Sequence, residues 1–179
     1  MRRERAFLII TGSVGAGKST LALALAELLR RESSMTVAVI DLDIVYCMLR
    51  QKDGFAELEL WPVARRACAA LTASLFAHGF DAVVLEGEFF TPLHFEEVLA
   101  EAPDLPPSTR FTLNVSYAET LRRVALDPSR GASKNPEFLR QLHTGFVAAL
   151  PFLRQHTTIL EADRQTPREL AVQIAAQLG

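Results

Sequence analysis

The chain has little of what would mark a membrane or nucleic-acid-binding protein. Its formal net charge is −2, so it has no general attraction to nucleic acid or to an anionic membrane surface. No apolar run approaches the length of a transmembrane segment, and the run over residues 6–11 is too short for the core of a signal peptide. We therefore expect a cytoplasmic protein without a membrane or nucleic-acid partner.

Cysteine is also scarce, since Cys47 and Cys68 are the only two. They form no C-x-x-C pair and have no histidines at zinc-like spacing, so we expect reduced thiols in the core. Internal repeats and low-complexity tracts are absent as well. Hydrophobic residues make up 49% and charged residues 22% of the 179 residues, which is an ordinary balance for a folded protein. The length suits a single domain over residues 1–179.

The most informative motif is a complete G-x-x-x-x-G-K-[ST] phosphate-binding loop. It consists of Gly12, Ser13, Val14, Gly15, Ala16, Gly17, Lys18 and Ser19. A short apolar run precedes the motif and an amphipathic helical pattern follows it, which is the context the motif requires. Its glycines let successive backbone N–H groups face one anion at the start of a helix. We expect these residues and Thr20 to bind a nucleotide, with Lys18 at the β- and γ-phosphates and Ser19 on Mg²⁺.

Strand and helix signals alternate along the rest of the chain, which predicts an α/β fold with a mainly parallel sheet. The predicted strands cover residues 6–11, 36–43, 82–86, 110–115 and 157–161. The predicted helices begin near residues 18, 62, 92, 117, 136 and 167. Ser116 and Thr166 are each followed three residues later by Glu, which predicts a capping box at both positions.

Carboxylates follow two of the predicted strands. Asp41 and Asp43 end the second strand, and an extended backbone would point both into the cleft above the phosphate loop. Phosphoryl transfer to a hydroxyl needs one carboxylate to accept or orient the proton and a metal shell to screen charge. Glu86 ends the third strand, where it would hold the Mg²⁺ shell through water. For Glu88, a substrate contact and a solvated position are both open.

Basic residues gather in and just before a polar insertion. They are Arg122, Arg123, Arg130 and Lys134. Guanidinium groups that close over a transferring phosphoryl group meet the charge on its oxygens and exclude water. We therefore predict a lid at about residues 123–137, in which Arg123 and Arg130 form the catalytic clamp.

On these residues the chain resembles the small P-loop kinases of the nucleoside-monophosphate-kinase group, most closely the shikimate and gluconate kinase branch and its AAA-domain ATP-binding relatives. The resemblance covers nearly the full length. It implies a three-layer α/β/α fold, a five-stranded parallel sheet in the order 2-3-1-4-5, and an acceptor pocket between strands 2 and 3. It also implies ATP and Mg²⁺ as cofactors, Asp41 near the metal and Asp43 at the acceptor hydroxyl. The adenine contacts it implies are Arg123, Asp163 and Thr166.

The resemblance leaves the acceptor open, because the glycine-rich segment of shikimate kinases after strand 3 is missing over residues 86–90. We predict a phosphotransferase that acts on a hydroxyl of a sugar acid, a polyol or a similar small molecule, with Trp61 and Arg65 in the acceptor pocket. One alternative is a nucleoside or nucleotide kinase, in which Arg65 or Arg66 binds the acceptor phosphate. An antibiotic phosphotransferase and a nucleotide-dependent regulatory ATPase are further alternatives. A GTPase is disfavoured, since no N/T-K-x-D motif follows strand 4.

Overall fold

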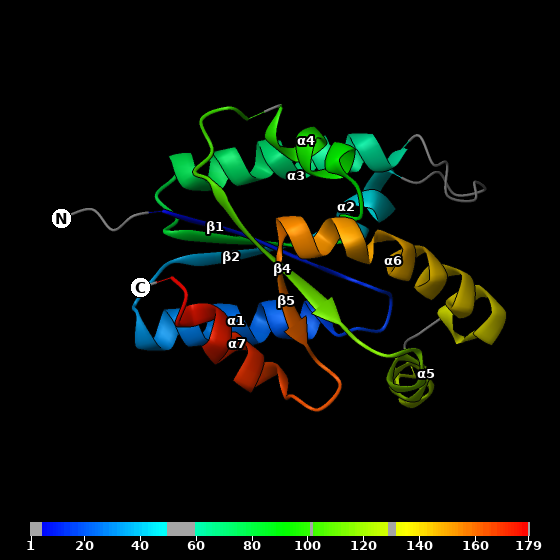
Figure 1. Ribbon diagram of the computed structural model, residues 1–179. Coiled ribbons are helices and arrows are strands. Elements are labelled where there is room, and N and C mark those ends of the chain that lie inside the picture. The colour runs from blue at the N-terminus through cyan, green and yellow to red at the C-terminus, as the bar shows by residue number, and fades with distance from the viewer. Residues whose placement is uncertain (1–4, 50–59, 101, 129–131, 179) are drawn as a thin grey trace.

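The protein is seen in a computed structural model that describes residues 5–49, 60–100, 102–128 and 132–178. Five parallel strands form one sheet in the order β2-β3-β1-β4-β5 (Figure 1). The strands are β1 (Ala6–Gly12), β2 (Val37–Asp41), β3 (Ala82–Gly87), β4 (Ser108–Asn114) and β5 (Thr158–Glu161). The predicted strand order 2-3-1-4-5 is therefore confirmed.

Helices cover both faces of the sheet, which confirms the predicted three layers. Figure 1 shows α1 (Lys18–Glu32) and α7 (Pro167–Ala175) on one side. The other side carries α2 (Leu42–Leu49), α3 (Leu60–Ala77), α4 (Pro92–Leu99) and α6 (Pro136–His156). Beyond the carboxyl ends of the strands lie α5 (Tyr117–Leu126) and the short 3-10 helix η1 (Ala132–Lys134), which overlap the segment predicted as a lid. Within the described ranges, no helix has both the length and the apolar character needed to cross a bilayer.

The sheet separates two apolar cores, and β1 shows how the sequence builds them. Leu8 and Ile10 pack into the core beneath α1 and α7, whereas Phe7 and Ile9 pack into the core beneath α3 and α4. Alternate side chains of a strand face opposite sides of the sheet, so a strand covered on both faces must be apolar throughout. This is why the continuous apolar run before the phosphate loop forms the central strand.

The helix starts follow the side-chain caps in the sequence, with one difference. Thr166 and Glu169 form the full predicted capping box at α7. At α5 the Ser116 side chain accepts from the Glu119 N–H, as predicted, but the Glu119 carboxylate does not return to Ser116. It binds Arg122 and Arg123 instead, because two guanidinium groups compete for it.

Two predictions about local structure are wrong. The second strand does not extend to Asp43, because Asp41 Oδ1 accepts hydrogen bonds from the N–H groups of Asp43 (2.8 Å) and Ile44 (3.1 Å) and so caps α2. Cys68 is a core thiol whose pKa burial raises to about 12, but Cys47 is exposed on α2. Both differences have one origin, since the short helix α2 was not predicted.

Candidate active site

The phosphate loop joins β1 to α1 through backbone conformations that favour glycine. Gly15 has a φ of 78° and Gly17 a φ of 96°. A Cβ added to Gly15 would lie 2.8 Å from Val124 Cγ2, so α5 packs directly on the loop. Gly17 is the N-cap residue of α1 and provides no side-chain hydrogen bond to the first turn of the helix. The first turn of α1 therefore has backbone donors that no capping side chain satisfies, which is the feature of helix starts that binds phosphate.

Lys18 lies inside this loop and is only 8% exposed. Its Nζ donates hydrogen bonds to the carbonyl oxygens of Gly12 (3.1 Å) and Ser13 (3.3 Å). Its positive charge also opposes the rise in the pKa of Glu86 and Glu88 that burial causes. The ammonium group therefore lies between the phosphate loop and the carboxylates of the neighbouring strand.

Two of the predicted carboxylates lie directly beside each other at the carboxyl edge of the sheet. Asp41 of β2 and Glu86 of β3 are register partners, and Glu86 is also paired with Ile10 of β1. Glu86 is only 2% exposed, and burial raises its pKa to about 7, with Asp41 adding to the rise. Lys18 and a hydrogen bond with the Ser19 side chain act in the opposite direction. The sheet order thus brings Ser19, Asp41 and Glu86 together.

This oxygen set fits Mg²⁺ chemically. Ser19 offers a hydroxyl, and Asp41 and Glu86 offer carboxylates, all of them hard oxygen donors. Across the part of the chain that the structure describes, there is no group of three or more His, Cys, Asp or Glu residues that could hold a metal. Mg²⁺ does not require such a cage, because it is usually held by one or two carboxylates together with waters and substrate phosphates.

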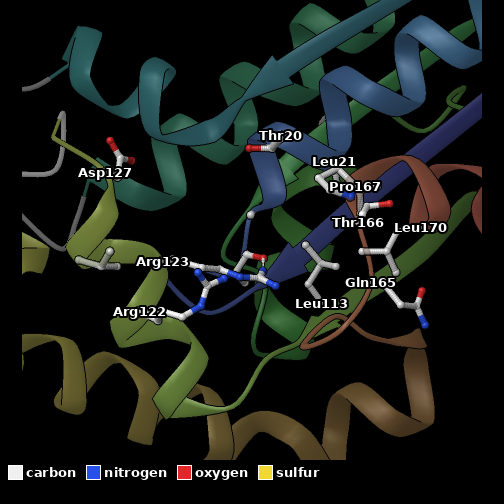
Figure 2. Close-up of a pocket in the computed structure, with 14 residues that line it drawn as sticks. Thr20, Leu21, Leu113, Arg122, Arg123, Asp127, Gln165, Thr166, Pro167 and Leu170 are labelled. Atoms are coloured by element: carbon white, nitrogen blue, oxygen red, sulfur yellow. Dashed lines mark hydrogen bonds between the residues drawn. The ribbon is translucent and has the colours of Figure 1, made fainter.

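A first cavity of about 430 Å³ lies between the phosphate loop, α5 and the start of α7 (Figure 2). Arg122 and Arg123 reach it from α5, and Thr166, Pro167 and Leu170 line the opposite side. Of the residues with an expected nucleotide contact, it includes Gly15, Ala16, Gly17, Thr20, Arg123 and Thr166. Asp163 is not among the lining residues; its carboxylate accepts from the Ser116 N–H at 2.8 Å.

A second cavity of about 830 Å³ lies on the other side of the loop. The predicted site residues that line it are Val14, Gly15, Gly17, Lys18, Ser19, Thr20, Asp41, Asp43, Trp61 and Glu86. Asp43 therefore faces the same cavity as Asp41, although it does so from the first turn of a helix and not from a strand. The two cavities share Gly15, Gly17, Thr20 and Asp127, so a ligand in one is next to a ligand in the other.

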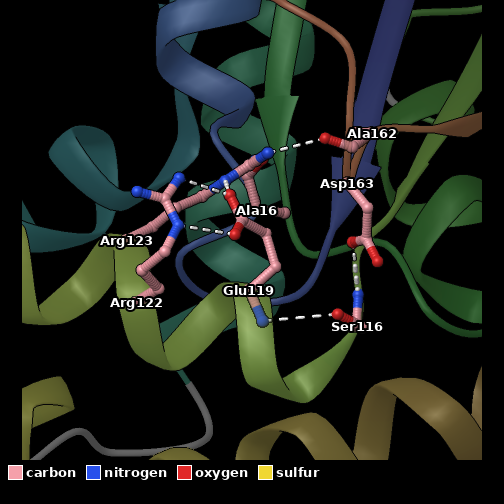
Figure 3. A network of polar contacts seen from close by, with 7 residues as sticks. All are labelled: Ala16, Ser116, Glu119, Arg122, Arg123, Ala162 and Asp163. Atoms are coloured by element: carbon pink, nitrogen blue, oxygen red, sulfur yellow. Dashed lines mark hydrogen bonds and ion pairs between the residues drawn. The ribbon is translucent and has the colours of Figure 1, made fainter.

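Arg123 of α5 forms hydrogen bonds within its own helix, to the phosphate loop and to the loop after β5 (Figure 3). Its Nε donates to Glu119 (2.7 Å), and its two terminal nitrogens donate to the carbonyl oxygens of Ala16 (2.7 Å) and Ala162 (2.6 Å). Hydrogen bonds from Arg122 and Arg123 lower the pKa of Glu119 to about 2. Arg123 thus connects α5 to the phosphate loop and to the loop after β5. It lines the first cavity and not the second, and the other expected clamp residue, Arg130, lies outside the described residues.

Of the two residues expected in the acceptor pocket, Trp61 lines the second cavity and Arg65 does not. Trp61 lines the second cavity and stacks on Tyr46 with ring centroids 3.9 Å apart and planes 11° apart. Arg65 does not line this cavity, because its guanidinium is buried against Glu97 of α4, to which its Nε donates. A buried charge must be paired, and the Glu97 carboxylate is the partner of the Arg65 guanidinium.

Several lining residues were not predicted. Ser133, Phe138 and Leu142 reach the second cavity from η1 and α6, and Asp127 follows α5. These positions carry no motif, and the packing of η1 and α6 beside the phosphate loop brings them to the cavity. Asp127 and Ser133 belong to the polar insertion at residues 127–136, whereas Phe138 and Leu142 belong to the helical pattern that follows it.

A family model described as adenylylsulphate kinase matches residues 4–85, which extend from β1 through the phosphate loop to β3. No curated protein matches the chain in sequence. The matched segment contains the phosphate loop and the Asp41–Asp43 pair, and it ends before Glu86 and the basic residues of the polar insertion.

Solved structures match the chain over nearly its full length. A gluconokinase from Sinorhizobium meliloti has a TM-score of 0.69 at 18% identity, with 99% of this chain and 93% of that chain covered. A shikimate kinase from Acinetobacter baumannii in complex with shikimate has a TM-score of 0.63 at 20% identity, covering 97% and 93%. A tunicamycin resistance protein from Deinococcus radiodurans has a TM-score of 0.65 at 18% identity, covering 98% and 96%. The expected resemblance to small P-loop kinases is confirmed, and the chain has their fold.

Proposed function

We propose that the protein transfers the γ-phosphoryl group of ATP to a hydroxyl group of a small molecule. The observation that carries this proposal is the second cavity, in which Lys18 of the phosphate loop and Asp43 of α2 face the same space. A nucleotide-binding loop alone would suit many activities. A carboxylate across an open cavity from that loop provides a place for an acceptor next to the nucleotide.

The nucleotide would occupy the first cavity and the loop. Its phosphates bind the backbone N–H groups at the start of α1 and the Lys18 ammonium. Its base lies between Arg123 on one side and Thr166 and Pro167 on the other, where the cavity has room. Asp163 acts indirectly, since it binds the N–H of Ser116 at the start of α5 and so positions the helix that carries Arg123.

Ser19, Asp41 and Glu86 are the residues that would hold Mg²⁺, which when bound screens the phosphate charge. Asp43 accepts the proton of the acceptor hydroxyl. The hydroxyl oxygen forms a bond to the γ-phosphorus, the bond from that phosphorus to the β–γ bridging oxygen breaks, and ADP leaves with the electron pair. Lys18 stabilises the negative charge on the transferring group. Phe138 and Leu142 of α6 limit the access of water to the cavity.

The tunicamycin resistance protein among the structural matches keeps an antibiotic hydroxyl among the possible acceptors. A nucleotide kinase, in which Arg65 or Arg66 would bind the acceptor phosphate, is less well supported. Arg65 is paired with Glu97, and neither arginine lines the second cavity. A regulatory ATPase would use no acceptor at all. These alternatives differ in what they do to ATP when a hydroxyl compound is added.

The experiment is to measure ADP formation with and without a panel of polyols, sugars, sugar acids, nucleosides and aminoglycosides, and to identify the phosphorylated product by mass spectrometry. The proposed function predicts that ADP forms only with an acceptor and in equal amount to a product 80 Da heavier, the mass of one added HPO₃ group. Asp104→Asn, a loop aspartate outside both cavities, is the matched control for carboxylate loss and should keep full activity. ADP formation at one rate with every compound and with none would contradict the proposal.

A further inference from the structure

Glu119 in the first turn of α5 has a carboxylate that the start of its own helix does not use. The helix is capped by the Ser116 side chain, which accepts from the Glu119 N–H at 3.3 Å. The carboxylate accepts hydrogen bonds of 2.7 Å from Arg122 and Arg123 instead (Figure 3). Glu119 is not among the lining residues of either cavity. The role of this carboxylate therefore lies in what it does to the two arginines.

Glu119 is one of three groups that hold the Arg123 guanidinium, and each of them binds a different nitrogen. Nε donates to Glu119 at 2.7 Å, and the two terminal nitrogens donate to the carbonyl oxygens of Ala16 (2.7 Å) and Ala162 (2.6 Å). A guanidinium is planar, and its N–H groups point outward in that plane. The two carbonyl contacts alone would let the plane turn about the line that joins them. The third contact, from Nε to Glu119, fixes its tilt.

The flat face of Arg123 is the main surface that these in-plane contacts leave for a ligand. The side chain is 25% exposed and lines the first cavity, opposite Thr166 and Pro167 (Figure 2). In the proposed function the nucleotide base lies between these residues. An aromatic ring gains most from a cation that lies over its face, so a guanidinium held at the wrong tilt would lose part of this contact.

Arg122 keeps the Glu119 carboxylate ionised. Its side chain is 62% exposed, and it binds Glu119 through two of its nitrogens. Hydrogen bonds from Arg122 and from Arg123 lower the pKa of Glu119 to about 2. The carboxylate is therefore charged at neutral pH, and its hydrogen bond with Arg123 is the stronger, charge-assisted kind.

We propose, resting on the proposed function, that Glu119 is a positioning residue for the nucleotide base. It does not touch the nucleotide, and it holds the Arg123 plane at the tilt at which the base packs on it. The phosphates are bound separately, by Lys18 and by the N–H groups at the start of α1. Glu119 therefore contributes to binding of the base and not to binding of the phosphates.

Loss of Glu119 should weaken the binding of ATP but not that of inorganic tripolyphosphate, which has the phosphates without a base. Isothermal titration calorimetry with Mg²⁺ and without an acceptor gives both dissociation constants. Glu119→Ala should raise the Kd for ATP by about fivefold or more and keep that for tripolyphosphate within about twofold. Glu137→Ala, which removes the first-turn acid of α6, is the matched control and should change neither. Equal weakening of both ligands, or an unchanged Kd for ATP, would overturn the proposal.

A double-mutant cycle with Arg123→Ala tests whether Glu119 acts through Arg123, and it needs only ATP. Adding Glu119→Ala to Arg123→Ala should keep the Kd for ATP within about twofold, because the group that Glu119 positions is gone. If Glu119 merely stabilised the start of α5, the second substitution would weaken binding again by the factor seen in the parent protein, and that result would overturn the proposal.

If circular dichroism shows that Glu119→Ala does not fold, Glu119→Gln takes its place in both measurements. It removes the charge but keeps an oxygen for Nε, so it should raise the Kd for ATP by about twofold or more. An unchanged Kd in this variant would also overturn the proposal.

No acceptor is present in these titrations, so they decide the role of Glu119 separately from the proposed function. If ATP is consumed without any acceptor, the proposed function fails, and the comparison of ATP with tripolyphosphate still decides whether Glu119 supports binding of the base. A protein that binds no ATP would overturn both.

Discussion

Asp41 and Glu86 are register partners on the neighbouring parallel strands β2 and β3, and Glu86 forms side-chain hydrogen bonds with Asp41 and with Ser19 at the start of α1. Three segments far apart in the sequence therefore bring three oxygen-bearing side chains close together. Glu86 has a raised pKa of about 7 because it is buried, and the Asp41 carboxyl adds to that rise. Because the two carboxyl groups are close together, this edge of the sheet is suited to a cation. Without a cation, negative charge on both groups is unfavourable.

The buried Glu86 makes the stability of the metal-free protein depend on pH. Its pKa of about 7 in the folded state lies above the ordinary value of 4.5, so the unfolded state loses its proton first as the pH rises. The free energy of unfolding should fall between about pH 4.5 and 7, by about 3 kcal/mol, and this contribution should stay constant above that range. Urea unfolding of Glu86→Gln without magnesium should show a smaller loss between pH 5 and pH 8. An equal loss in both proteins would contradict this reading of Glu86.

Arg123 should be more important for nucleotide binding than its neighbour Arg122. Arg123→Lys keeps the charge but loses the planar group that reaches Glu119, Ala16 and Ala162 together. We expect its Kd for ATP to rise by about 10- to 100-fold, since hydrogen bonds from charged groups contribute about 1.5–3 kcal/mol. Arg122→Lys is the control, because within the described structure the side-chain hydrogen bonds of this exposed residue go to Glu119. Isothermal titration calorimetry gives both values, and equal affinities for the two variants would count against the role of Arg123.

Lys18→Ala should separate phosphate binding from folding. The Lys18 ammonium is the one cation placed inside the phosphate loop in the described structure, where it binds the Gly12 and Ser13 carbonyl oxygens. Without it, the affinity for ATP should fall by about 10- to 100-fold. Far-UV circular dichroism should remain that of the parent protein, because the two apolar cores are untouched. A variant that still binds ATP as tightly as the parent would contradict the assignment of the loop.

Glycine is required in the loop but not in α6. Gly15→Ala forces a φ of 78° on alanine and places its Cβ 2.8 Å from Val124 Cγ2, so we expect a loss of about 1–3 kcal/mol. Gly145→Ala in α6 meets no atom within 4 Å and should raise the free energy of unfolding by about 0.5–1 kcal/mol. Chemical denaturation measures both. Similar effects in the two variants would show that the tight contact with α5 does not matter.

Most of the fold could be predicted because its signals are local. The apolar run before the phosphate loop, the caps at Ser116 and Thr166, and the alternation of strands and helices all act within a few residues. The resemblance to P-loop kinases then supplied the strand order. The same local reasoning was wrong at Asp43, since a side-chain cap from Asp41 begins α2 where the pattern favoured an extended strand.

The site was harder to predict where it depends on partners distant in sequence. Arg65 was expected at the acceptor, but its partner Glu97 lies 32 residues further along the chain and draws it into the core. Arg123 was expected both at the transferring phosphoryl group and at the adenine. Its hydrogen bonds to Ala16 and Ala162, 107 and 39 residues away, hold it at the first cavity. No spacing in the sequence encodes such pairs. They follow from the packing of α4 on α3 and of α5 on the loop.

The most direct test of the account is the effect of Asp43→Asn on acceptor-dependent ADP formation, measured with the best acceptor of the panel and compared with Asp104→Asn. Asp43 lines the cavity next to the phosphate loop, and a general base of this kind contributes about 10²- to 10⁴-fold. The account predicts a fall of that size in kcat, with an unchanged Kd for ATP. Normal turnover by Asp43→Asn would contradict the assignment of Asp43 as the residue that accepts the proton.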